Sequence, residues 1–73
     1  MSDEEHAFVR NFVDRIGRGG VGVGENHDAP PLSQGAQERI RAAAAKGGMN
    51  VEFSQSIFNG QRTVSTRRGP INR

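Results

Sequence analysis

The sequence predicts a small α+β domain in which two short helices pack on a C-terminal β-hairpin. Asn59-Gly60 lies between two runs of alternating apolar and polar residues, which is the strongest short-range signal of a hairpin. Two stretches with helix caps precede these runs, and a glycine-rich stretch separates them. We expect residues 1–68 to form one domain with a flexible loop at 17–31, and residues 69–73 to form a disordered tail.

The first helix is predicted at residues 3–16. Ser2 and Glu5 have the spacing of a capping box, in which each side chain accepts a hydrogen bond from the other residue's backbone N–H. Phe8, Phe12 and Ile16 then recur every four residues and form an apolar stripe. We expect this stripe to pack in the core rather than to bind a partner.

Residues 17–31 are predicted to form a flexible linker, because five glycines and a Pro-Pro pair make both helix and strand costly. Gly17, Gly19 and Gly22 have the spacing of the dinucleotide-binding motif G-x-G-x-x-G. That motif follows a strand and opens a helix, whereas this one follows a helix and leads into more loop. We therefore exclude dinucleotide binding here.

The second helix is predicted from Ser33, which can cap it, to Lys46, after which Gly47-Gly48 ends it. Its apolar edge is thin, and the run Ala42–Ala45 has the highest intrinsic helix propensity. Small side chains let another element approach closely, so this helix is expected to lie flat on the hairpin.

A two-residue type I′ turn at Asn59-Gly60 would fix the register of the hairpin, with Phe58 opposite Gln61 and Phe53 opposite Thr66. Phe58 is then the only large apolar residue on the polar face. It either packs under the glycine-rich loop or is exposed as an anchor for a partner, and the sequence leaves both open. The apolar face would carry Val51, Phe53, Ile57 and Val64.

Enzymatic activity, a cofactor and a bound metal are not expected. The chain has no cysteine and two histidines, His6 and His27, whereas a zinc site takes three or four ligands. A chain of 73 residues can hardly enclose a dry, preorganised pocket around a Ser-His-Asp group. The acidic start and the absence of a long apolar run argue against a signal peptide and a membrane span, so we expect a cytoplasmic monomer.

Charge is unevenly distributed along the chain, which suggests a surface that recognises a charged partner. The first 36 residues hold three basic and six acidic side chains, a formal charge of −3, and the other 37 hold seven basic and two acidic, +5. We favour protein binding. Nucleic-acid binding through the arginine-rich hairpin, and a structural subunit that folds only in an assembly, are the alternatives. The expected partner contacts are Asp3, Glu4, Glu5, Arg39, Arg41, Phe58, Arg62, Arg67 and Arg68.

In whole-chain character, the sequence resembles the small phage-encoded regulators that bind host bacterial RNA polymerase. The features they share are short length, the absence of cysteine, split charge and a preference for arginine over lysine. The resemblance involves no residue motif, so it carries over no functional residue. It implies a non-enzymatic transcription regulator that docks on a polymerase subunit and inhibits or redirects host transcription.

Overall fold

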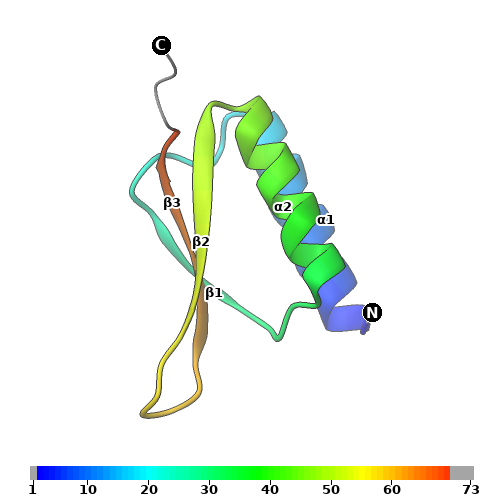
Figure 1. Cartoon of the computed structure of the whole chain (residues 1–73). Helices are drawn as coiled ribbons and strands as arrows, with labels where there is room; N and C mark the ends of the chain where they lie inside the picture. The colour runs from blue at the N-terminus through cyan, green and yellow to red at the C-terminus, as the bar shows by residue number, and fades with distance from the viewer. Residues whose placement is uncertain (1, 70–73) are drawn as a thin grey trace.

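Two helices and three strands follow one another in the order α1, β1, α2, β2, β3 (Figure 1). The computed structural model describes residues 2–69. The helices are Asp3–Gly17 (α1) and Gln34–Lys46 (α2), and the strands are Asn26–Ala29 (β1), Met49–Gln55 (β2) and Arg62–Arg68 (β3). The predicted α+β class, with two helices ahead of a C-terminal hairpin, is confirmed.

The three strands form one antiparallel sheet in the order β1-β3-β2, and both helices lie on the same face of it (Figure 1). α1 and α2 run side by side in the same direction, and each is followed by a strand that runs back. Because β1 returns the chain to the end at which α1 begins, the N-termini of the two helices lie together.

The two helices begin differently. In α1 the predicted capping box is present: Ser2 Oγ accepts a hydrogen bond from Glu5 N (3.1 Å), and Glu5 Oε1 accepts one from Ser2 N (3.3 Å). In α2, Ser33 Oγ accepts a hydrogen bond from Ala36 N (3.2 Å), but no acidic residue lies in the first turn. An anion that offsets the positive end of α2 must therefore come from another element.

Side chains from both layers meet in the core. Phe12 of α1, Ile40 of α2 and Val64 of β3 are at most 1% exposed, and they lie at its centre. Full burial of one such side chain contributes about 1.5–3 kcal/mol. The opposite face of the sheet has no helix over it and carries polar residues such as Glu52 and Arg67. The core is therefore one layer of side chains between the sheet and the helices.

The segment ahead of β1 is attached to the sheet through a buried hydroxyl. Thr66 is only 1% exposed, and its Oγ1 donates a hydrogen bond to the Gly22 carbonyl (2.6 Å) and accepts one from Glu25 N (3.0 Å). Val21 is also buried in the core. The glycine-rich segment is thus held against β3 at several points.

The structure corrects the predicted linker at 17–31, because Asn26–Ala29 form β1. β1 lacks the β-branched and aromatic residues that are typical of strands. Its partner is distant in sequence, since Asn26 lies opposite Ser65, 39 residues later. The strand is therefore formed by tertiary pairing, which local sequence patterns do not reveal.

The predicted hairpin exists, but its register differs by two residues from the prediction. Phe53 lies opposite Val64 rather than Thr66, and residues 56–61 join the strands. A type I′ turn needs positive φ at both central residues, whereas only Gly60 has it (φ +70°) and Asn59 does not. The two-residue turn was therefore the wrong assignment.

A shift of two residues keeps each side chain of the paired strands on its expected face, because side chains alternate with a period of two. Val51 and Val64 are accordingly buried toward the helices, as predicted. Ile57 is the exception, because the longer connection places it in the loop, where it is 92% exposed.

The predicted tail at 69–73 is outside the described residues except for Gly69, whose N–H donates a hydrogen bond to the Gly48 carbonyl (3.0 Å). Within residues 2–69, neither helix has the length and apolar composition that a membrane span requires. The described part of the chain is therefore one sheet with two helices on one face.

We predict that the same substitution has different effects at two isoleucines. Ile40→Val removes a methylene group from a fully buried side chain and should lower the free energy of unfolding by about 0.5–1.5 kcal/mol. Ile57→Val changes an exposed side chain and should alter it by less than about 0.5 kcal/mol. Urea unfolding followed by circular dichroism measures both, and equal effects would contradict the assigned core.

Candidate functional site

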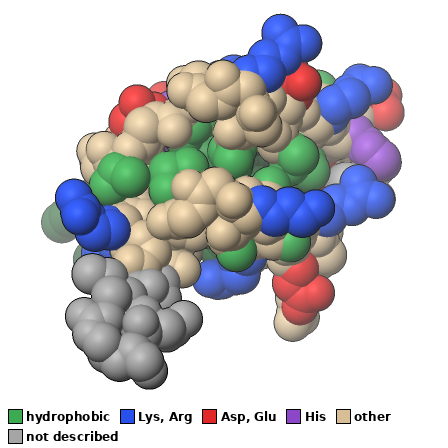
Figure 2. Space-filling model, turned by 90° about the horizontal axis from the view of Figure 1, so that it is seen from above, with side chains coloured by type: hydrophobic (Ala, Val, Ile, Leu, Met, Phe, Trp, Pro, Cys, Tyr) green, Lys and Arg blue, Asp and Glu red, His purple; other side chains and the backbone are tan. Residues whose placement is uncertain are grey.

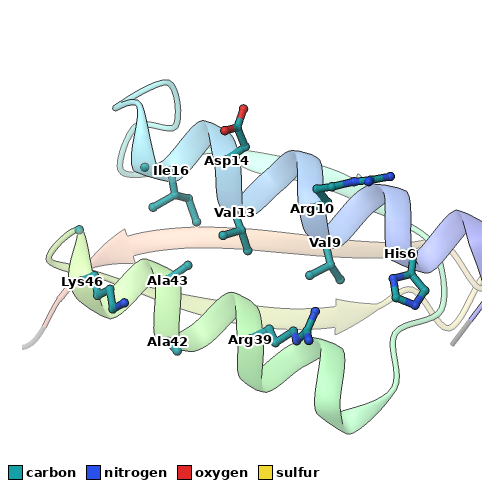
Figure 3. Close-up of a pocket in the computed structure, with 12 residues that line it drawn as sticks. His6, Val9, Arg10, Val13, Asp14, Ile16, Arg39, Ala42, Ala43 and Lys46 are labelled. Atoms are coloured by element: carbon teal, nitrogen blue, oxygen red, sulfur yellow. The ribbon is translucent and has the colours of Figure 1, made fainter.

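α1 and α2 leave a groove between them on the side away from the sheet (Figure 3). Its volume is about 970 Å³, and every residue that lines it belongs to α1, to α2 or to the residue that directly follows α2. Because the helices are parallel, residues from corresponding turns face each other across it, with His6 and Arg39 at one end and Ile16 and Lys46 at the other.

The floor of the groove is apolar. Val9, Val13 and Ile16 of α1 have the spacing i, i+4, i+7, and they point toward α2 (Figure 3). On α2 the facing residues are Ala42 and Ala43. Alanine leaves the groove open where a larger side chain would fill it, so the alanine-rich run of α2 explains why the hollow exists.

The edge of the groove is mostly cationic. Arg10, Arg39 and Lys46 line it and are exposed, and none of them forms an ion pair or a side-chain hydrogen bond with another residue of the described segment 2–69. Asp14 is the acidic residue of the lining, and Arg18 already pairs with it (3.2 Å). The groove thus combines an apolar floor with uncompensated positive charge.

Figure 2 shows the molecule from the end at which both helices finish. Hydrophobic side chains gather in a band through the middle of this end, and basic and acidic side chains lie around the band. The apolar surface at this end is therefore bordered by charged side chains of both signs.

Glu5 holds the N-termini of the two helices together. Its side chain is buried, with the residue 5% exposed, and Oε2 accepts a hydrogen bond from the N–H of Ser33, the N-cap residue of α2. Oε1 accepts the bond from Ser2 that caps α1. The hydrogen bond from the Ser33 backbone holds the pKa of Glu5 below its ordinary value of 4.5 and outweighs the opposing effect of burial.

The predicted contacts on the helices have different environments. Asp3 and Glu4 are exposed in the first turn of α1, whereas Glu5 is buried. Arg39 lines the groove. Arg41 points the other way: its guanidinium lies 5.0 Å from the centre of the Phe53 ring and donates a hydrogen bond to the Val51 carbonyl (3.4 Å). Glu5 and Arg41 therefore hold elements of the fold together.

The arginines of the hairpin do not form one patch. Arg67 lies on the open face of the sheet, where it pairs with Glu52 across the strands (2.5 Å). Arg62 and Arg68 lie at opposite ends of β3, about 20 Å apart at the usual rise per strand residue. Side chains alternate along a strand, so Arg62 and Arg68 are on the face of Val64 and Arg67 is on the opposite face.

Phe58 lies in the loop that joins β2 and β3, and it is 94% exposed beside the equally exposed Ile57. Of the two alternatives for Phe58, packing under the glycine-rich loop is therefore wrong and exposure is confirmed. The loop lies at the end of the sheet away from the C-terminal ends of the helices (Figure 1).

His27 is the histidine with the most side-chain contacts. Its Nε2 lies 2.9 Å from Glu25 Oε1, its Nδ1 lies 3.4 Å from an Arg15 nitrogen, and its ring packs edge-on against Phe12. Within residues 2–69, no group of three or more metal-ligating side chains comes together. The His27 contacts therefore attach β1 and the glycine-rich segment to α1.

Most residues of the groove are not among the predicted partner contacts. Among the predicted contacts only Arg39 lines it, and Arg10, Val13 and Lys46 were not singled out. One signal was present: Arg39, Ala42, Ala43 and Lys46 have the spacing i, i+3, i+4, i+7 and so share one face of α2. That this face adjoins α1 depends on the tertiary fold.

No family model, curated protein or solved structure matches this chain.

We predict that Glu5→Gln lowers the melting temperature at neutral pH, because the amide keeps an acceptor but loses the charge between two helix N-termini. Since the folded-state pKa of Glu5 is below 4.5, its contribution is complete above that pH and is lost as the pH falls through the folded-state value. The difference between variant and native chain should therefore become smaller as the pH falls below 4.5. Thermal unfolding followed by circular dichroism at about pH 7 and about pH 3 measures this.

Glu4→Gln is the matched control, because Glu4 lies in the same helical turn and is exposed. If Glu5→Gln is no less stable than Glu4→Gln at neutral pH, the bridge between the helices contributes nothing.

Proposed function

We propose that this chain is a non-enzymatic protein-binding module that docks on a larger partner protein through the groove between α1 and α2. The observation that carries the proposal is an apolar floor, which includes Val13 and Ala43, beside the cations Arg10, Arg39 and Lys46, which have no ion-pair partner among residues 2–69. Arginine beside an apolar centre is typical of protein interfaces, where a few such residues supply most of the affinity.

The groove fits a protein better than a nucleic acid. Its lining contains no Phe, Tyr or Trp on which a base could stack. The hairpin arginines, which were the basis of the nucleic-acid alternative, are dispersed, and Arg67 is neutralised by Glu52. A duplex surface needs several phosphate contacts along one face, and the hairpin arginines do not supply such a face.

We further propose a regulatory role, with a subunit of bacterial RNA polymerase as the first partner to test. Support for this choice comes from the whole-chain resemblance to small phage-encoded regulators. Polymerase surfaces near nucleic acid offer charged patches, to which a module with separated charges can be complementary.

Two tryptophan substitutions on α2 test the docking surface. Ala42→Trp fills the groove, whereas Ala45→Trp adds the same side chain at an exposed position that does not line it. Binding of purified bacterial RNA polymerase should be about tenfold or more weaker for Ala42→Trp and nearly unchanged for Ala45→Trp. Biolayer interferometry with and without nuclease measures this.

Equal affinity of the two variants would show that the polymerase does not use the groove. Binding that disappears with nuclease would favour the nucleic-acid alternative. If the native chain does not bind polymerase at all, the polymerase assignment is wrong. Docking at the groove can then still be tested with peptides.

A further inference from the structure

The shape of the groove suits a bound α-helix. Val9 and Ile16 are seven residues apart, so the apolar floor extends about 10 Å along the axis of α1. These two side chains are only 3% and 8% exposed, so the accessible part of the floor is formed mainly by Val13, Ala42 and Ala43. On α2, Arg39 and Lys46 are also seven residues apart, and Ala42 lies between them. A partner helix with apolar residues at i, i+3, i+4 and i+7 would place two turns of side chains on this floor.

A helix suits this groove better than an extended segment. Both walls are helices, whose backbone groups are bonded internally, so they offer no edge to which a strand could pair. An extended occupant would leave its own N–H and C=O groups unpaired against an apolar floor, whereas a helix satisfies them internally. The small side chains of Ala42 and Ala43 also allow a helix to approach closely.

The charge of the groove decides the composition of its occupant. Arg10, Arg39 and Lys46 contribute three positive charges at its edge, and Asp14 is already paired with Arg18. Acidic side chains beside the apolar face of a partner helix would pair with these cations, and no ion pair among residues 2–69 would have to break. A basic helix would meet repulsion along both walls.

We infer that the groove binds an acidic amphipathic helix from a partner protein. This inference depends on the proposed function, because it names the occupant of the same groove. A second copy of this chain fits poorly, since the apolar residues Phe12 of α1 and Ile40 of α2 are already buried in the core.

A display library of helix-biased peptides of about 14 residues, close to the shortest length at which an isolated helix forms, tests the inference. Selection on the immobilised native chain should enrich peptides with apolar residues at i, i+3, i+4 and i+7 flanked by Asp and Glu. The best peptides should bind Ala42→Trp and Arg39→Glu about tenfold more weakly than the native chain. Affinities for the controls Ala45→Trp and Arg68→Glu should be nearly unchanged.

The possible failures are distinguishable. If neutral or basic peptides are enriched and Ala42→Trp blocks them, the acidic occupant is wrong but the groove remains the docking surface. If a proline at the centre of an enriched peptide leaves its affinity unchanged, the occupant is not helical. If Ala42→Trp blocks no peptide, or no peptide is enriched, the proposed function fails together with this inference. A dimer of the native chain in sedimentation that Ala42→Trp disperses would identify a second copy as the occupant.

Discussion

The structure depends on one buried carboxylate at the point where two helices begin. α1 and α2 run in the same direction, so the positive ends of their dipoles lie side by side, an arrangement that is unfavourable without a nearby anion. α2 has no acidic residue in its first turn. Glu5 supplies the charge for both helices, because its two oxygens accept hydrogen bonds from Ser2 and Ser33. The hydrogen bond from the Ser33 backbone accordingly lowers the pKa of Glu5.

Parallel helices in turn determine the rest of the fold. Each helix must be followed by a segment that returns the chain to its starting end, and β1 and β2 are these segments. β3 lies between them and pairs with both, which closes the sheet over Phe12 and Ile40. The same parallel arrangement aligns the outer faces of the helices, so that Val13 and Ala43 face one shared groove (Figure 3). The candidate docking surface is thus a consequence of how the helices are joined at their N-termini.

Sequence patterns predicted what is local and missed what is not. The caps at Ser2 and Ser33 place the helix starts correctly, because capping involves residues within one turn. β1 was missed because its partner is distant in the chain, and the turn was misassigned because Asn59 does not adopt the conformation that Asn-Gly usually favours. Of the candidate site, the charge pattern identified Arg39. The pairing of that face with α1, and the use of Glu5 within the fold, depend on tertiary contacts.

The bridge between the helix N-termini is the most direct point at which to test this account. The measurement is an NMR titration of the Ser33 amide from about pH 7 down to the lowest pH at which the chain stays folded, with Glu5 as the titrating group that accepts its hydrogen bond. We expect the Ser33 amide proton to be shifted downfield at neutral pH and to move upfield with a midpoint below 4.5 as Glu5 becomes protonated. A Ser33 amide that does not respond to pH, or a midpoint at or above 4.5, would show that no such bridge joins the two helices.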